Sequence, residues 1–506
     1  MVVSIVALSI SMSSIESRAK DWRNGAVIYQ VFVDRFVPPT DPKSKAKFFP
    51  APRKFKAWDE LPKGGKFDPK VGVWTHELDF WGGDLPGVES KIGYIRELGA
   101  DVVYLNPIHE AFTNHKYDAS DYMKIDPSFG TMKDMSDLIA KSHKSGMKVV
   151  LDGVFNHMGR HTPYLASALS SENSPYRKWF FIDKKYKAGY KGWLGGTNMP
   201  VNHLEDVGLR KYLWTGSDSV VQHFLKLGID GWRLDVAYEI GPEFLGDLTK
   251  HAHKAKKGSL VVGEMLGYPA GWFPNVDGQY NLFAPELCNQ ALKGNISGGR
   301  VGLMLNDYVQ DAGIEHVLKS WLIADNHDMV RLATALPEME DRKLALALLF
   351  SLPGCPNIYY GTELGMTGGD DPANRAPMRW DLNTPENETL SWVKKLIGFR
   401  KTHPSLRYGD FHALQTDKLI AFTRTTGKLR ENVIVVVNPT DKKVTETFAH
   451  RIGNLMSWQT IEDQITGEKM TQKVGMMTVQ IPPKSIRIYT PVVTRTNGFS
   501  PFDRIK

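Results

Sequence analysis

GIDGWRLD (residues 228–235) is an apolar run that stops on a carboxylate, and it decides the fold of this chain. Two later stretches, LVVGE (260–264) and WLIADNHD (321–328), have the same form, and the three runs end on Asp235, Glu264 and Asp328. A strand of a parallel barrel is buried along its length and delivers its last side chain to the open rim. A single Asp at the end of a strand is commonly a turn residue and would not by itself indicate a catalytic site. Three such endings predict carboxylates gathered for acid, base and nucleophile chemistry.

The same alternation of apolar strands and helical stretches extends outward in both directions. Apolar runs predict eight strands, over residues 26–36, 100–108, 147–157, 231–235, 260–264, 277–282, 321–325 and 357–360. Helical periodicity lies between them, for example over 131–145 and 219–227. Eight strand–helix units predict an α/β fold, a (β/α)₈ TIM barrel.

Three stretches depart from this alternation. Residues 158–204, after the third strand, are rich in Tyr, Trp, Gly and Ser with little periodicity, and they predict an inserted domain on the rim. Residues 407–506 contain short alternating segments bounded by turn residues, which predict a C-terminal antiparallel β-sandwich. Residues 1–21 form an N-terminal extension. The barrel is therefore expected over 22–157 and 205–406.

Composition narrows the function classes. The 506 residues carry a formal charge of +7, but much of this excess lies in the proline-containing stretch 43–70. A solvated surface insertion explains that stretch better than a polyanion patch, and no nucleic-acid module accompanies it. We therefore expect no nucleic-acid partner. Cys288 and Cys355 are the two cysteines, without metal-ligand spacing, and indicate neither a disulfide framework nor a zinc site.

The start of the chain bears on localisation. MVVSIVALSISMSS (1–14) has an apolar core of signal-peptide length without a preceding basic region. An exported location, periplasmic or extracellular, is therefore favoured over a cytoplasmic one. No apolar run reaches the length of a membrane span, so no membrane association is expected.

From about residue 22 to the C-terminus the chain resembles the α-amylase superfamily, glycoside hydrolase family thirteen. The family's four defining regions look like DGVFNH (152–157), GWRLDVAYE (231–239), GE (263–264) and NHD (326–328), in the family's order. Further support comes from NHKYD (114–118), IYYGTE (358–363) and GGDDPANR (368–375). The resemblance implies a barrel, a domain inserted after strand three and a C-terminal β-sandwich.

The resemblance also implies roles for the three carboxylates. Asp235 corresponds to the nucleophile, Glu264 to the general acid/base and Asp328 to a carboxylate that grips sugar hydroxyls. Retaining glycosidases place nucleophile and acid about 5–5.5 Å apart, and their environments must differ so that one stays ionised and the other protonated. Arg233, on the same strand face as Asp235, is expected to keep that carboxylate charged.

Other residues of this chain stand at positions where the family binds its substrate. His157 and His327 resemble the family's hydrogen-bond donors to sugar hydroxyls, and Tyr117 its stacking platform. Asp371 and Arg375 resemble contacts to glucose units further along the donor side. Plain alternatives stay open: core packing for Tyr117, a satisfied rim histidine for His157, and a purely structural ion pair between Arg375 and Asp371. Asp152 is assigned to structure, orienting Arg233.

Departures from the family pattern point to one branch. Many α-amylases have Lys and His where this chain has Tyr238 and Glu239, and the Glu is similar to the cyclomaltodextrinase, neopullulanase and maltogenic amylase branch. We expect Glu239 to contact substrate. The related segment MPVNHLED (199–206) reads VNH where the branch has xLN.

The family's calcium ligands look depleted. Pro200 stands in place of a carboxylate that often binds the central calcium, although Asn156 remains. The segment VPPTDP (37–42) lacks most ligands of a second site, although Asp84 remains. We predict no metal site and no required cofactor.

The expected function is retaining hydrolysis of α-1,4 bonds in starch-derived oligosaccharides and maltodextrins, with cyclodextrins and pullulan as further candidate substrates. The branch also carries an N-terminal β domain that supports dimerisation, whereas the barrel here begins at about residue 22, so monomer and homodimer both stay open. A glucanotransferase using the same covalent intermediate is the alternative within enzymes. A non-catalytic binding subunit with this fold is the alternative outside them.

Overall fold

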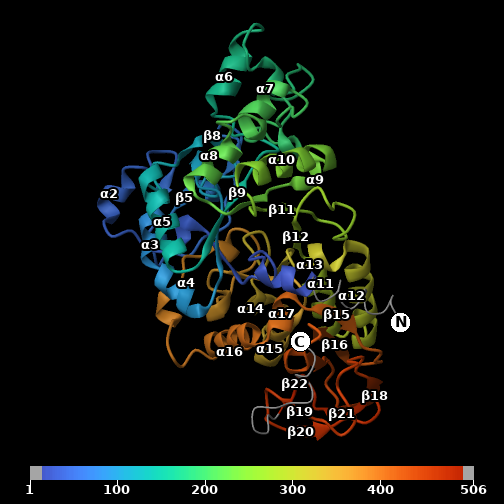
Figure 1. The fold of residues 1–506 in the computed structure, drawn as a ribbon. Coiled ribbons are helices and arrows are strands. Elements are labelled where there is room, and N and C mark those ends of the chain that lie inside the picture. Colours follow the sequence, from blue (N-terminus) through green and yellow to red (C-terminus); the bar gives the residue numbers. More distant parts are fainter. Residues whose placement is uncertain (1–13, 494–506) are drawn as a thin grey trace.

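The computed structural model describes residues 14–493, and its centre is a closed barrel of eight parallel strands (Figure 1). Around the barrel the order is β1 (Ile28–Val31), β14 (Cys355–Tyr359), β13 (Trp321–Ile323), β12 (Gly278–Asn281), β11 (Leu260–Glu264), β10 (Gly231–Leu234), β9 (Lys148–Gly153) and β6 (Val102–Leu105). Each strand overlaps one of the eight apolar runs, and β14 begins two residues before the run given for it. The predicted (β/α)₈ barrel is confirmed.

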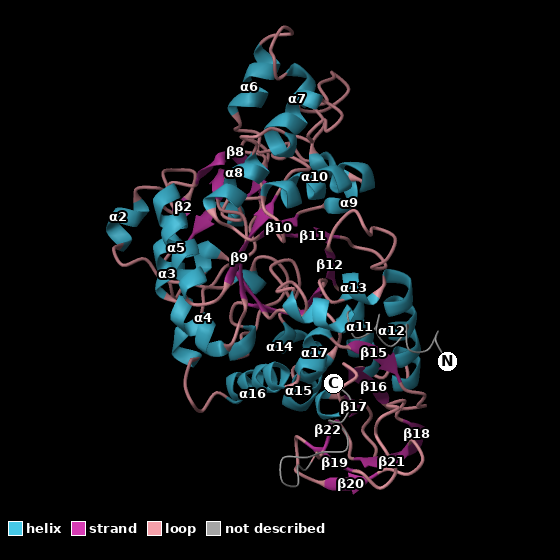
Figure 2. Cartoon of the chain, viewed as in Figure 1, coloured by secondary structure: helices cyan, strands magenta, loops and turns pink. Residues whose placement is uncertain are grey.

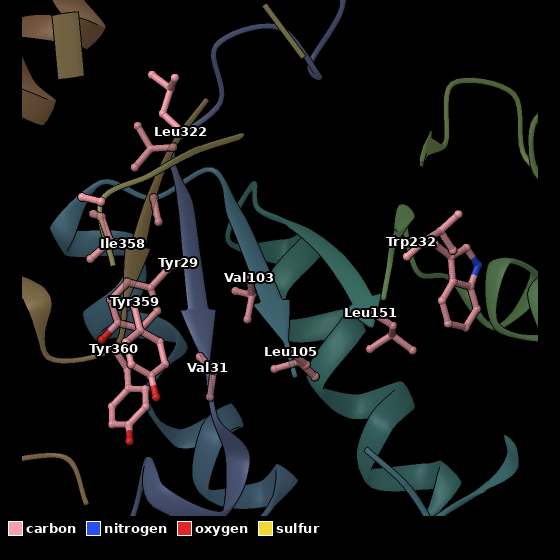
Figure 3. Packing of buried hydrophobic residues seen from close by; sticks show 14 of the residues in the cluster. Tyr29, Val31, Val103, Leu105, Leu151, Trp232, Leu322, Ile358, Tyr359 and Tyr360 are labelled. Atoms are coloured by element: carbon pink, nitrogen blue, oxygen red, sulfur yellow. The ribbon is translucent and has the colours of Figure 1, made fainter. Parts of the chain in front are cut away.

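The strands have two apolar faces because both are covered. One set of alternate residues fills the barrel interior, including Ile28, Val102, Val262 and Trp321. The other set packs outward against helices, and Figure 3 shows Val103, Leu105 and Leu151 of this outer layer. Alternation along a strand therefore fixes which side chains point into the barrel.

Helices surround the strands (Figure 2). They include α3 (Leu85–Ser90), α4 (Ile92–Leu98), α5 (Met132–Lys144), α8 (Val220–Leu227), α10 (Pro242–Ala255), α11 (Phe283–Leu292), α12 (Gly298–Ala312), α15 (Met339–Ser351) and α16 (Glu388–Thr402). The sequence predicted α5 and α8 to within a residue of each end. The Thr131 hydroxyl caps α5 by accepting a hydrogen bond from the Asp134 amide. In turn, the Asp134 carboxylate accepts a hydrogen bond from the Thr131 amide.

The segment that follows β9 projects beyond the barrel and is drawn at the top of Figure 1. It contains α6 (Pro163–Ser170), two 3₁₀ turns, η3 (Arg177–Trp179) and η4 (Trp193–Gly195), and then α7 (Val207–Arg210). Its interior is aromatic: Trp179 packs against Tyr164, Tyr176 and Tyr212. These rings stabilise a segment with few long elements.

A second excursion follows β1, within residues 37–80. It contains the short helix α2 (Pro42–Ala46), the paired strands β2 (Lys54–Phe55) and β5 (Asp79–Phe80), and the hairpin β3 (Phe67–Asp68) with β4 (Val73–Trp74). The basic stretch that was expected to be a solvated loop is therefore partly ordered into paired strands.

The last part of the chain forms two antiparallel sheets. Six strands pair in the order β15 (Asp410–Ala413), β16 (Ile420–Thr425), β17 (Val433–Asn438), β22 (Ser485–Pro491), β19 (Thr460–Asp463) and β20 (Lys469–Thr471), and β18 (Val444–Ala449) pairs with β21 (Met476–Ile481). Side chains of both sheets, such as Ile434 and Val479, share one apolar cluster. This is the predicted C-terminal β domain.

Two stretches for which the sequence made predictions lie outside the described residues. They are residues 1–13, which hold most of the signal-like segment, and residues 494–506 of the last domain.

Within residues 14–493, no helix combines the length and the apolar character that a bilayer crossing requires. Both cysteines are buried and unpaired.

Candidate active site

Arg233 organises the site at the carboxyl end of the barrel strands. It is the third residue of β10 and completely buried, facing the interior between β9 and β11. Its Nη1 lies 2.8 Å from Asp152 Oδ1 and 3.1 Å from Asp235 Oδ1, and its Nη2 lies 2.5 Å from Glu264 Oε1. One guanidinium therefore holds three carboxyl groups from three neighbouring strands.

The two predicted reacting carboxyls are brought together where β10 and β11 end. Asp235 and Glu264 are 7% and 8% exposed, so both reach the surface of the barrel mouth. The chain turns sharply after Asp235, because Val236 has a left-handed backbone with φ 47°. The Val236 amide donates a hydrogen bond of 3.1 Å to Glu264 Oε2. The turn therefore links the two carboxyl positions directly.

Three carboxyls around a single guanidinium cannot all ionise easily. Burial raises the pKa of Asp235 well above its ordinary value, repulsion from Glu264 adds to this, and Arg233 opposes it. Arg233, which the sequence led us to expect would keep Asp235 charged, lowers the pKa of Asp235, but by less than burial raises it.

Asp152 lies beneath these groups and fixes the guanidinium. Its two oxygens lie 2.8 and 3.0 Å from Arg233 Nη1. It also accepts hydrogen bonds from the hydroxyls of Tyr104 (2.6 Å) and Tyr117 (2.9 Å). The orienting contact expected of Asp152 is present, whereas Tyr104 was not anticipated.

Tyr117 and His327 form one wall of the site. Tyr117 is 9% exposed, and its hydroxyl takes part in polar contacts with both Asp152 and His327, which plain core packing does not explain. His327 is buried, and burial together with Arg375 lowers its pKa well below the ordinary value. The imidazole is therefore neutral and keeps one N–H donor.

Asp328 stands at the outer edge of the site. Its side chain is 49% exposed, and its Oδ1 lies 3.1 Å from Nη2 of Arg375. Arg375 Nη1 lies 3.1 Å from Asp371 Oδ1, and its Nε donates to the His327 carbonyl. Arg375 therefore connects Asp371 to Asp328, which goes beyond an isolated pair with Asp371.

His157, Glu239 and Trp193 form the opposite side. His157 is 1% exposed, and neither of its ring nitrogens has a hydrogen-bond partner within residues 14–493. Trp193 of η4 stacks on it, with ring centroids 5.3 Å apart and planes at 19°. The Trp193 indole also donates to Glu239 Oε1 at 3.1 Å. His157 is thus a buried imidazole whose ring face is covered by Trp193.

Trp193, like Tyr104, is a residue beside the predicted site residues that the sequence analysis did not single out. Its signal in the sequence is the run GWLGG (192–196), where glycines surround a bulky ring. A Cβ on Gly192 would meet the Gly196 carbonyl oxygen at 1.6 Å, so this tight turn requires glycine.

A cavity of about 400 Å³ lies beside Trp193 and Glu239 and is also lined by Asn156, Lys191 and Glu205.

Asn156 and Asp84, the residues that remain from the family's calcium ligands, both contact other side chains. Asn156 donates its amide to Glu239 Oε2 at 3.0 Å. Asp84 accepts the α3 amide of Gly87 and lies 2.6 Å from the Lys45 ammonium. In the described part of the chain, no three His, Cys, Asp or Glu side chains are grouped to hold a metal ion.

Known sequences and structures are similar to this chain over most of its length. The family described as alpha amylase, catalytic domain, matches residues 30–267 and 301–409. Neopullulanase 2 of Thermoactinomyces vulgaris is 31% identical over 481 residues, 92% of this chain and 77% of that protein. Cyclomaltodextrinase of Geobacillus thermopakistaniensis is 29% identical over 497 residues, 93% of this chain and 78% of that protein.

Among solved structures, cyclic alpha-maltosyl-(1-->6)-maltose hydrolase from Arthrobacter globiformis, in complex with cyclic alpha-maltosyl-(1-->6)-maltose, superposes with a TM-score of 0.76. It is 27% identical and covers 91% of this chain and 99% of its own. The chain therefore belongs to the α-amylase family and is a glycosidase of the cyclomaltodextrinase and neopullulanase type.

Proposed function

We propose that the protein hydrolyses α-1,4-glucosidic bonds of starch-derived oligosaccharides, with retention of configuration at the cleaved carbon. The observation that carries the proposal is the shared guanidinium: Arg233 holds Asp235 by one nitrogen and Glu264 by the other. A nucleophile and an acid must lie on either side of one glycosidic bond, and this arrangement presents two carboxyls from neighbouring strand ends.

In the first step an oxygen of Asp235 attacks the anomeric carbon, and the bond from that carbon to the glycosidic oxygen breaks. Glu264 gives its proton to the departing oxygen. In the second step Glu264 takes a proton from water, whose oxygen attacks the anomeric carbon and releases Asp235. Asp328 and His327, which lie 3.1 Å apart, grip the hydroxyls of the same glucose as positive charge develops on its ring.

Glu264 must change its contacts before it can act as the acid. Its two oxygens accept hydrogen bonds from Arg233 and from the Val236 amide, and both bonds favour the charged form. When a bound sugar draws Glu264 away, the guanidinium is left to Asp235 and Asp152. Arg233 then stabilises the negative charge of Asp235, and Glu264, released from these two bonds, carries the proton for the departing oxygen.

Transfer to a second sugar is the other candidate reaction. The intermediate on Asp235 is the same, and a sugar hydroxyl takes the place of water. The cavity beside Trp193 and Glu239 offers room and polar groups for such an acceptor. Maltodextrins are the proposed primary substrate class, and cyclodextrins and pullulan are further candidates.

A panel of maltodextrins, cyclodextrins and pullulan, with product anomers resolved by NMR, tests the proposal. We expect the α-anomer to form first from maltodextrins, and Asp235→Asn to abolish turnover while the fold is kept. Initial formation of the β-anomer would exclude a retaining mechanism. Products longer than the substrate at high maltodextrin concentration would assign the transferase reaction instead.

A further inference from the structure

The hairpin β3–β4 presents an exposed aromatic pair, Phe67 and Trp74. Phe67 and Trp74 lie directly opposite each other across the hairpin, so they share one face. Their ring centroids are 5.9 Å apart, edge to face at 71°. They are 45% and 48% exposed. Packing within the hairpin therefore leaves about half of each ring in contact with solvent.

The hairpin is held firmly in place. The Trp74 amide donates to Glu77 at 2.8 Å, and Asn114 donates to the His76 carbonyl at 2.8 Å. At the hairpin tip, Arg160 of the inserted segment donates to the Val71 carbonyl at 2.9 Å. The aromatic pair therefore has a fixed position between the barrel rim and the inserted segment, which lowers the entropy cost of binding a ligand.

His76 connects this aromatic face to the catalytic carboxylates. Its ring lies 6.1 Å from that of Trp74, tilted by 32°. Its Nε2 lies 3.8 Å from Asp371 Oδ2, and Asp371 joins Asp328 through Arg375. A continuous row of polar and aromatic side chains therefore runs from Asp328 to Trp74.

The chemistry at His76 suits a hydroxyl ligand. The Gly65 amide donates to His76 Nδ1 at 3.0 Å, which leaves Nε2 as the donor nitrogen of the ring. That N–H faces the Asp371 carboxylate across a gap too long for a direct hydrogen bond. A single hydroxyl can accept from His76 and donate to Asp371, which satisfies both groups at once.

We propose that Trp74 and His76 form a further glucose-binding subsite, on the Asp371 side of the cleft and beyond the units next to the cleaved bond. The inference rests on the proposed function. Trp74 stacks its indole face on the apolar face of a glucose ring, supported behind by Phe67, while His76 and Asp371 share one of the hydroxyls. Shorter oligosaccharides do not reach this subsite, so it sets a preference for longer chains.

The test measures binding rather than turnover. Calorimetric affinities for maltotriose and maltoheptaose are compared in an Asp235→Asn background with and without Trp74→Ala. We expect Trp74→Ala to weaken maltoheptaose binding about three- to tenfold, the range that one aromatic contact supplies, and to leave maltotriose binding unchanged. Trp74→Phe should retain most of the affinity because it keeps an aromatic face.

The matched control is Trp458→Ala, which removes an exposed indole, 67% exposed, in the C-terminal domain. It should change neither affinity. Equal weakening of both oligosaccharides by Trp74→Ala, or no weakening of either, would overturn the subsite while leaving the proposed function intact. If the Asp235→Asn protein binds neither oligosaccharide, the substrate class of the proposed function is wrong and the subsite falls with it.

Discussion

Tyr117 and His327 lie ring on ring, with centroids 5.3 Å apart and planes within 4°, and the Tyr117 hydroxyl is 2.6 Å from His327 Nε2. The same hydroxyl donates to Asp152, which in turn holds Arg233. This phenol therefore couples the orientation of a neutral imidazole to the guanidinium that gathers the reacting carboxyls.

Tyr117→Phe removes this coupling and keeps the ring. The loss leaves buried acceptors with one partner fewer, which costs about 1–3 kcal/mol. We expect kcat/KM for maltodextrin to fall by roughly ten- to a hundredfold, and the melting temperature to fall by the few degrees that this loss of folding free energy implies. Steady-state kinetics and calorimetric melting check this, and unchanged kcat/KM would show that the ring alone matters.

Replacing Trp193 separates stacking from hydrogen bonding on the opposite wall. Trp193→Phe keeps a ring over His157 but loses the indole donor to Glu239, whereas Trp193→Ala loses both. We expect the Ala variant to lower kcat/KM about tenfold, an energy of about 1.4 kcal/mol, and the Phe variant to retain more of the activity. Similar kinetics for the two variants would assign the effect to the Glu239 hydrogen bond.

His157 makes stability depend on pH. Burial lowers its pKa to about 3 from an ordinary value near 6.5, so between these values the unfolded chain binds a proton that the folded chain does not. Its neutral form therefore supports folding fully above pH 6.5, and this support is lost as the pH falls toward 3.

His157→Gln removes that proton uptake. Between pH 7 and pH 5 the free energy of unfolding of the variant should fall by about 2 kcal/mol less than that of the parent. Urea denaturation at both values measures the difference. An identical fall in the two proteins would mean that His157 titrates normally in the folded chain.

Metal removal should leave the enzyme unaffected. Pro200 supplies no side-chain oxygen at the first family calcium position, and at the second the Lys45 ammonium already neutralises Asp84. We expect EDTA to change neither the maltodextrin rate nor the melting temperature. Loss of activity that calcium restores would establish a metal requirement.

Much of this architecture is predictable because it is encoded locally. The barrel strands are apolar runs with alternating faces, and carboxylates at their ends mark the rim, so the amino-acid sequence alone predicts that Asp235 and Glu264 lie together. Along the antiparallel strands of the C-terminal domain, apolar and polar residues alternate, which also makes these strands predictable from the sequence.

Long-range contacts are not predictable in this way. The stacking of Trp193 on His157 and the Tyr104 hydroxyl on Asp152 depend on the paths of loops and on side-chain rotamers. The Phe67–Trp74 pair lies in and next to a stretch whose composition indicates only a solvated insertion. The pKa of Asp235 depends on three carboxyls surrounding one guanidinium, which no local pattern reveals.

Trapping the covalent intermediate tests the central claim most directly. In Glu264→Gln, an α-maltosyl fluoride still forms the intermediate because fluoride leaves without protonation, but water is no longer activated to release it. Mass spectrometry of the digested protein should find one maltosyl group on the peptide, at Asp235. A label on any other residue, or rapid turnover without a label, would contradict the account.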